Sequence, residues 1–338
     1  MHRCHPAGMT PDWKDRHQLQ DLRTETLTST EISEGIQSGR LVRLTAEIAI
    51  NKQYYHELPP WDKAEARAVA VGLSADKAVV SGMAAARLWG VNLLGVEDVV
   101  DLHLPGRGRP GAKAGWINGA RYRSAILPES QTTTLGGVRV TVLLRALVDI
   151  ARHESHFEAV AAIDSVRRKW PHVDEARLLK EVAAYGRFPG KRKFLRAVEL
   201  SRPKIGSPWE TKARLLLEES GIKEIVTVET QVEFKDTITG KHYFVDILIN
   251  GWLVLEVDGK SKYTGEYGDA PEKVILDERE REKALQNLGT TVIRTDKSGL
   301  EVKPGGSCEM LQMVQRALQN FNPPKSLPRV DGLDKIVS

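Results

Sequence analysis

The feature that most limits how this chain can fold is the dipeptide Asn250-Gly251, which stands between two apolar segments. His242–Ile249 precedes the dipeptide and Trp252–Asp258 follows it. Asn-Gly between apolar runs is typical of a two-residue β-hairpin turn, because both residues of that turn take a positive φ. The sequence therefore predicts two adjacent antiparallel strands.

The segments around this hairpin predict a mixed sheet flanked by helices. Ser207, Pro208 and Glu210 are typical of a helix start, with a capping side chain, a proline at the first helical position and an acid in the first turn. Further strands are expected at Thr230–Phe234 and Thr290–Arg294, and further helices at Glu272–Leu288 and Cys308–Asn320.

Acidic side chains lie on one face of the predicted hairpin. Residues two apart in a strand share a face, so Glu256, Asp258 and Lys260 form a row. Asp246 is the single acid of the preceding strand, and the hairpin brings it close to Glu256 in register. Carboxylates held together in an apolar sheet repel one another, and a Mg²⁺ or Mn²⁺ ion relieves that repulsion. The pattern indicates a site for metal-dependent phosphodiester hydrolysis; the alternative is a solvent-facing strand with mixed charges.

The spacing of Asp246, Glu256, Asp258 and Lys260 resembles the core of PD-(D/E)XK nucleases, in which an Asp on one strand is followed by an acid-x-Lys on the next. A wider set of segments, in the family's order, is similar to small endonuclease domains like the very-short-patch repair endonuclease. These segments are Ser207–Leu217, Gln231-Val232, Val245–Ile247, Leu255–Gly259, Asp277–Leu285 and Gly289–Arg294.

This resemblance implies a Mg²⁺ (or Mn²⁺) cofactor and a set of site residues. The implied metal ligands are Glu210, Asp246 and Glu256. The implied catalytic residues are Asp246, Glu256, Asp258, Lys260 and Arg281. Of these, Arg281 would point at the scissile phosphate, and Gln231 would support the site from the first strand of the sheet.

The segment after Asp258 departs from this family. The family often has a His two or three positions after the Asp-Gly pair, where this chain has Lys260-Ser261-Lys262-Tyr263. A general base is missing there or is replaced by Lys262, which is also a candidate DNA contact. An inactive domain that kept the fold for DNA binding therefore stays open as an alternative.

The first part of the chain predicts a small DNA-binding domain. Short helices followed by a strand within residues 12–60 are typical of a winged helix-turn-helix, with a small helical cap as the alternative. In a winged helix, Ser29–Gln37 would be the helix that reads DNA, and Arg40 and Arg43 would contact phosphates.

Three segments of the first half resemble AbiEi-type antitoxins, which pair a winged helix with an α/β-helical middle domain. These segments are Ser38–Arg43, Arg87–Gly90 and Val140–Ala151. Between the last two lies Pro105–Lys113, a solvated loop rich in glycine and basic residues. Its Arg107 and Arg109 are candidate phosphate contacts, or they only keep a flexible hairpin loop soluble.

Composition sets further limits. Lys and Arg number 49 against 45 Asp and Glu, a formal net charge of +4, which excludes a histone-like protein that binds DNA through bulk charge. Cys4 and Cys308 make no disulfide framework, and no apolar run approaches the length that spans a membrane. We expect a cytoplasmic protein that binds double-stranded DNA and no membrane; a homodimer is left open.

Together these patterns predict an α+β multidomain protein. The expected parts are a winged helix at 12–60, an AbiEi-like mixed α/β middle domain at 61–202, a PD-(D/E)XK nuclease-like domain at 203–320 and a flexible tail at 321–338. The expected function is Mg²⁺-dependent hydrolysis of DNA phosphodiester bonds. The alternative is a transcriptional regulator, of antitoxin or phage-repressor type, whose inactive nuclease fold serves DNA binding or dimerisation.

Overall fold

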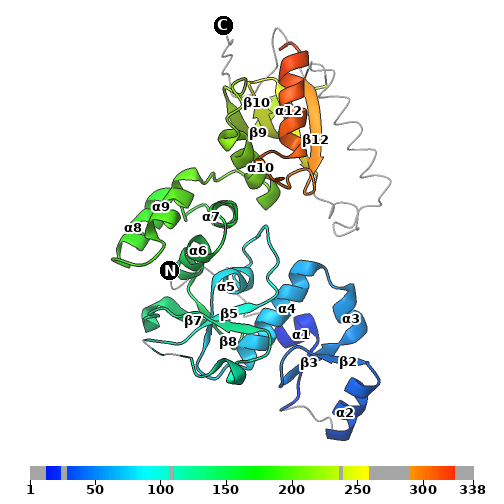
Figure 1. The fold of residues 1–338 in the computed structure, drawn as a ribbon, viewed down its shortest axis with the longest axis vertical. Helices are drawn as coiled ribbons and strands as arrows, with labels where there is room; N and C mark the ends of the chain where they lie inside the picture. Colours follow the sequence, from blue (N-terminus) through cyan, green and yellow to red (C-terminus); the bar gives the residue numbers. More distant parts are fainter. Residues whose placement is uncertain are drawn as a thin grey trace. The chain divides into compact units, whose positions relative to one another are not determined.

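The computed structural model describes residues 13–23, 29–106, 108, 110–235, 239–258 and 290–323. These residues have an α+β fold with eleven α-helices and three sheets (Figure 1). The chain divides into two compact units. The first runs to Val166 and includes Val173–Ser201; the second comprises Arg167–His172 and the residues from Arg202 onwards.

The N-terminal part of the first unit is built around a three-stranded antiparallel sheet with the strand order β1-β3-β2. Its elements are α1 (Trp13–His17), β1 (Leu19–Asp21), α2 (Ser29–Gln37), β2 (Leu41–Arg43), β3 (Ile48–Asn51) and α3 (Lys52–Glu57). Ile48 and Ile50 of the central strand are fully buried. Asn51 begins α3 by accepting a hydrogen bond from the amide of Tyr54 (3.0 Å).

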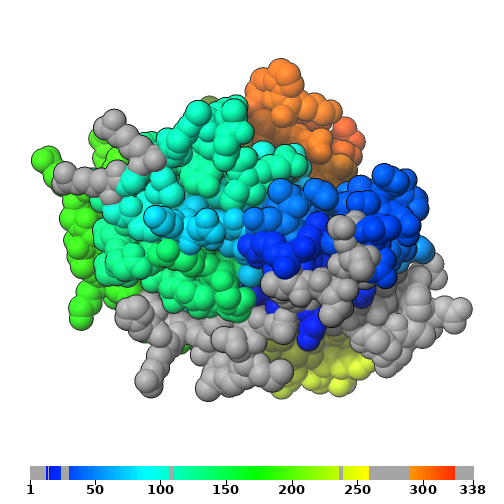
Figure 2. Space-filling model, turned by 90° about the horizontal axis from the view of Figure 1, so that it is seen from below, coloured from blue at the N-terminus to red at the C-terminus, as the bar shows by residue number. Residues whose placement is uncertain are grey.

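This small sheet packs on the middle region of the same unit. Trp13 Nε1 donates a hydrogen bond to the carbonyl of Leu135 (3.1 Å), and His17 Nε2 lies 2.9 Å from Glu65 Oε1. Figure 2 shows the N-terminal residues (blue) in contact with those of the middle region (cyan to green). The segments on both sides of residue 60 therefore belong to one compact unit.

The middle region contains a five-stranded mixed sheet with the strand order β6-β5-β4-β8-β7. Its strands are β4 (Val79–Val80), β5 (Val100–His103), β6 (Ala120–Tyr122), β7 (Thr132–Leu135) and β8 (Val138–Thr141). The pairs β4–β8 and β5–β6 are parallel. Gly136 and Gly137 form the turn between β7 and β8 with φ of +50° and +82°, a conformation that favours glycine.

Helices and short 3-10 turns complete the first unit. They are α4 (Pro60–Leu73), α5 (Gly82–Leu88), η1 (Lys113–Gly115), η2 (Glu129–Gln131), α6 (Leu143–His153), α7 (His156–Lys169), α8 (Glu175–Ala183) and α9 (Lys191–Leu200), and the last residues of α7 belong to the second unit. Helix α6 is buried along most of its length and packs on α5, α8 and α9. Leu143, Leu147 and Ile150 follow the helical spacing of an apolar face.

The second unit contains a four-stranded sheet with the strand order β12-β11-β10-β9. Its strands are β9 (Val228–Lys235), β10 (His242–Ile249), β11 (Leu253–Asp258) and β12 (Thr291–Asp296). Strand β10 is antiparallel to both β9 and β11, and β12 runs parallel to β11. Helices α10 (Pro208–Glu219) and α12 (Glu309–Asn320) contact each other and pack on this sheet (Figure 1).

The predicted hairpin between β10 and β11 is confirmed, with one difference in register. Asn250 and Gly251 have φ of +52° and +75°, and the amide of Trp252 donates to the carbonyl of Ile249 (3.1 Å), as a two-residue turn requires. However, Ile249 pairs with Leu253, so Trp252 is an additional residue on the second strand. One extra residue moves every side chain of a strand to the opposite face relative to its partner.

The helix predicted at Glu272–Leu288 lies outside the described residues. No helix in the described part of the chain is long and apolar enough to cross a membrane.

Candidate active site

The first turn of α10 carries an acidic side chain into the interior of the second unit. Ser207 begins the helix, and its hydroxyl accepts a hydrogen bond from the amide of Glu210 (3.2 Å). The Glu210 carboxylate turns back, and its Oε2 accepts a hydrogen bond from the amide of Gly206 (2.8 Å). Only 6% of Glu210 is exposed. The helix start thus fixes a buried carboxylate over the sheet.

Gly206 leaves the space that this carboxylate occupies. A Cβ at position 206 would lie 2.8 Å from Glu210 Oε1 and 3.0 Å from Oε2. Since real Cβ atoms do not come that close to another heavy atom, any other residue would displace the carboxylate. Glycine is therefore the residue that fits here.

Gln231 of β9 holds the same carboxylate from the opposite side. Its Nε2 donates a hydrogen bond to Glu210 Oε2 (2.8 Å). Gln231 has a φ of +52°, which is rare for a residue with a side chain. The pairing of β9 with β10 is interrupted at this residue, which faces Asp246 across the two strands. The supporting role that the sequence suggested for Gln231 thus coincides with a local distortion of the strand.

Asp246 of β10 and Glu256 of β11 follow the last pair of the hairpin ladder. That pair is Ile247 with Leu255, and the same register extended by one residue would oppose Asp246 to Glu256 on one face. This register depends on Trp252, because a hairpin without that additional residue would oppose Asp246 to Leu255. Asp246 Oδ2 also accepts a hydrogen bond from the amide of Val257 (2.9 Å).

Electrostatics connects Glu210 to this pair. The pKa of Glu210 is raised above its ordinary value, first because burial disfavours the charged form and second because the negative charge of Asp246 lies nearby. Glu256 is only 4% exposed. The carboxyl groups of Glu210 and Asp246 therefore lie near each other in a poorly hydrated region, and Glu256 is buried on the strand next to β10.

The remaining predicted acid and one unpredicted basic residue lie at the side of this group. Asp258 ends β11, is partly exposed and pairs in register with Asp296 of β12. Arg294 of β12 pairs in register with Glu256, which places a guanidinium on the strand next to the acids. The sequence assigned no role to Arg294, since the parallel register of β11 with β12 cannot be read from either segment alone.

The donor atoms of this site suit a hard divalent cation, but their number is small. Within residues 13–258 and 290–323, as far as they are described, no three or more His, Cys, Asp or Glu side chains group closely enough to hold one metal ion. Mg²⁺ is often held by only one or two carboxylates together with waters and substrate phosphates. A Mg²⁺ ion at this place would therefore need further oxygen atoms, from water or from a phosphate group.

The other predicted site residues lie elsewhere. Arg40 and Arg43 flank and end β2 in the first unit; both are exposed, and within the described part of the chain neither guanidinium has a hydrogen bond or ion pair. The remaining predicted DNA contacts and catalytic residues lie outside the described residues. They are Arg107, Arg109, Lys260, Lys262 and Arg281.

A hollow with basic side chains lies beside Arg40. It has a volume of about 540 Å³ and is lined by the basic residues Arg40, Lys52 and His56 with the polar residues Ser38, Asn51 and Gln53. None of the described residues that line it is acidic. A hollow with these properties attracts anions such as nucleic-acid phosphates.

Comparison with known proteins gives no match. No protein-family model fits this chain, and a search of curated proteins finds no significant similarity.

Proposed function

We propose that this protein binds DNA and that its second unit hydrolyses phosphodiester bonds with Mg²⁺ or Mn²⁺. The observation that carries this proposal is the approach of the buried Glu210 of α10 to Asp246 of β10, with Glu256 buried on the neighbouring strand β11. Two like charges in a poorly hydrated region destabilise a fold, and such groups are common where chemistry requires them. Ordinary packing gives no reason to keep them together.

The chain's own residues would position the reacting groups. Gly206 and Gln231 hold the carboxylate of Glu210, and the amide of Val257 holds that of Asp246. Glu210 and Asp246 would bind the ion, with Glu256 on the neighbouring strand, and the ion when bound polarises a phosphate and acidifies water. By its resemblance to PD-(D/E)XK nucleases, the sequence adds Asp258 at the third catalytic position, Lys260 beside it, and Arg281 for the developing charge on the phosphate.

The small number of carboxylate ligands makes metal and DNA binding interdependent in this proposal. A phosphate of the DNA would supply oxygen atoms that the described residues do not. We therefore expect weak Mg²⁺ binding by the free protein and stronger binding in the presence of DNA.

The direct test is nicking of supercoiled plasmid by the full chain with Mg²⁺ or Mn²⁺. Asp246→Asn keeps the side-chain shape and removes the charge, and it should lower the rate at least about 100-fold. Glu301→Gln, which removes an exposed acid from the same unit, should leave the rate unchanged. Equal nicking by wild type and Asp246→Asn, or no nicking by a folded wild type with either metal, would contradict the catalytic proposal.

A second candidate function is supported by the first unit. Helix α2 is followed by two strands in a sheet of the order β1-β3-β2. Arg40 directly precedes β2 and Arg43 ends it, and both side chains are exposed. This arrangement supports a winged helix, and the basic hollow supports phosphate contacts. The protein would then be a transcriptional regulator of antitoxin or phage-repressor type, with the nuclease fold serving DNA binding or dimerisation.

A gel shift on DNA from the protein's own promoter separates the two candidates. Regulation predicts sequence-specific binding that is lost with Arg40→Ala and Arg43→Ala and kept with Glu256→Ala. Arg196→Ala, an exposed arginine of α9, is the matched control for loss of one positive charge. Binding without preference for the promoter counts against a regulator.

A further inference from the structure

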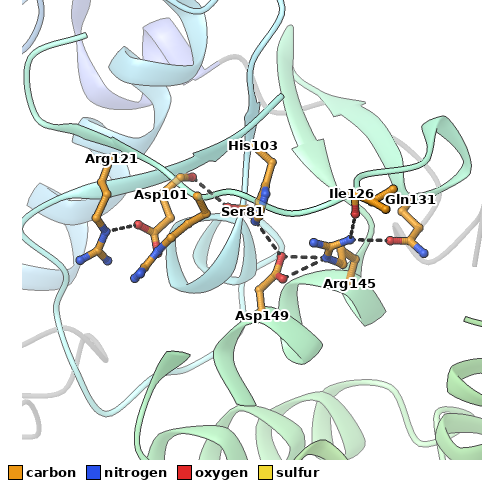
Figure 3. A network of polar contacts seen from close by, with 9 residues as sticks. Ser81, Asp101, His103, Arg121, Ile126, Gln131, Arg145 and Asp149 are labelled. Atoms are coloured by element: carbon orange, nitrogen blue, oxygen red, sulfur yellow. Dashed lines mark hydrogen bonds and ion pairs between the residues drawn. The ribbon is translucent and has the colours of Figure 1, made fainter. Parts of the chain in front are cut away.

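A second polar site lies in the first unit, at the edge of the five-stranded sheet. Strand β6 is the edge strand and runs parallel to β5, with Arg121 in register with Asp101. Arg121 Nε donates to Asp101 Oδ1 (2.6 Å), and Arg123 Nε donates to Asp101 Oδ2 (3.0 Å). Figure 3 shows Asp101 next to Arg121 at one end of this polar network. One carboxylate therefore holds two guanidinium groups.

The two arginines keep most of their donors available. Each uses only its Nε–H on Asp101, and within the described residues the terminal nitrogen atoms of both have no partner. The side chain of Arg121 is 46% exposed and that of Arg123 is 23% exposed, while Asp101 is 11% exposed. The Asp101 carboxylate that holds both side chains is thus nearly buried. The terminal nitrogen atoms of the two guanidinium groups stay available to donate hydrogen bonds to a ligand.

The end of α6 adds a third arginine and a histidine. In the described part of the chain, Arg152 forms no hydrogen bond or ion pair, and Gly190 at the start of α9 packs against its backbone and stem. Among the described residues, the buried Nε2 of His153 has no hydrogen-bond partner. The pKa of His153 is lowered to about 4, first by burial and then by the positive charges of Arg123, Arg152 and Arg121, against the opposing charge of Asp101. Arg152 directly precedes His153 at the end of α6, and Arg121 and Arg123 share the Asp101 carboxylate.

A second imidazole below the site is fully buried. His103 is 0% exposed, and neither ring nitrogen forms a hydrogen bond in the described structure. Its Nε2 points toward Asp149 Oδ2 at 3.7 Å, and Asp149 is held by Arg145 Nε (3.0 Å). Figure 3 shows Asp149 of α6 joined by dashed lines to Arg145 and to His103, which lies on the same strand as Asp101. Asp101 and Asp149 are thus both already bound by arginine side chains.

We propose that Arg121, Arg123 and Arg152 form a binding site for a phosphate group. Phosphate oxygens accept paired hydrogen bonds from guanidinium forks, and here two forks are held in place by Asp101. The charges facing the site are these three arginines, with Asp101 and, beside Arg121, Glu154 on the acidic side. A bound phosphate would also give His153 an anion to which it can donate. The phosphate belongs either to a nucleic-acid backbone or to a small phosphate compound.

The test uses the full chain and follows the His153 ring signals by NMR, with inorganic phosphate as one probe and a short DNA duplex without terminal phosphates as the other. We expect saturable binding and a rise of at least about one unit in the pKa of His153, because a nearby anion favours the imidazolium. Arg152→Gln, which removes no contact within the described structure, should weaken binding about tenfold or more. Arg139→Gln, on β8 of the same sheet, is the control and should bind as wild type.

Each outcome decides a separate point. Saturation by inorganic phosphate alone assigns a small phosphate compound, and a response to the duplex alone assigns a backbone phosphate. If neither probe moves the His153 signals, or if Arg152→Gln and Arg139→Gln bind alike, the proposal is wrong. Arg123→Lys, which keeps the charge and loses the fork, separates lost recognition from lost charge. The site lies in the first unit, so plasmid nicking by the second unit does not affect the result.

Discussion

Gln231 donates a hydrogen bond to Glu210 from a backbone conformation with a φ of +52°, so a strained strand residue supports a buried acid. A side chain in the left-handed region costs about 1 kcal/mol relative to glycine. The hydrogen bond to Glu210 therefore helps to hold Gln231 in this unfavourable backbone conformation.

Gln231→Gly should be more stable than Gln231→Ala by about 1 kcal/mol, because both lose the hydrogen bond and only glycine relieves the strain. The free energies follow from hydrogen exchange of the β9 and β10 amides. Equal stability of the two variants would show that residue 231 leaves the left-handed region once the glutamine is removed.

Gly206→Ala should destabilise the second unit by roughly 1–3 kcal/mol, because the new Cβ displaces the Glu210 carboxylate. The same change in a Glu210→Ala background should cost much less, since the clashing oxygen atoms are then absent. A double-mutant cycle by urea unfolding measures the difference. Additive effects would place the strain elsewhere than between these two residues.

Glu210→Gln should stabilise the second unit at neutral pH and have less effect at pH 4. The folded pKa of Glu210 is raised, so its favourable contribution is present below the unfolded value of 4.5 and is lost as the pH rises through the folded pKa. The neutral amide side chain in Glu210→Gln does not ionise and so avoids that loss. Hydrogen exchange of the β10 and β11 amides at pH 4 and pH 8 measures the stability of wild type and Glu210→Gln. A stability gain that is the same at both pH values would contradict this reasoning.

Acid should unfold the first unit through His103. Burial lowers its pKa from 6.5 to about 3, so stability is present above 6.5 and is lost as the pH falls toward 3. Asp149, with its pKa raised to about 6 mainly by burial, acts in the opposite direction by a smaller shift. His103→Gln should therefore move the acid midpoint in circular dichroism to lower pH, while His172→Gln, outside this network, should leave it unchanged.

The hairpin was readable from the sequence because Asn250-Gly251 determines its turn locally. Its register was not, since Trp252 adds one residue after a turn that is otherwise regular. The positive φ of Gln231 also has no local signal, because glutamine rarely takes it and a tertiary contact imposes it. The sequence indicated the acids of the site and the support by Gln231, but not the contacts of Gly206 and of the Val257 amide.

The short strands of the first unit were harder to predict for a related reason. Strand β4 has two residues and β6 has three, too few for an alternating pattern to stand out. Their positions depend on pairing with distant segments, as in the parallel register of Asp101 with Arg121. The phosphate site proposed here therefore had no signature in either segment alone.

Glu210 lies in the first turn of α10, so a movement of this helix would change the pKa of the Glu210 carboxyl group. Further along α10, Arg214 is only 1% exposed and forms an ion pair with Glu218 (2.8 Å). A change there that slides or tilts the helix would alter the separation of Glu210 from Asp246 without touching either residue. Distant substitutions in α10 would then change the pKa of Glu210 while Glu210 and Asp246 themselves stay the same.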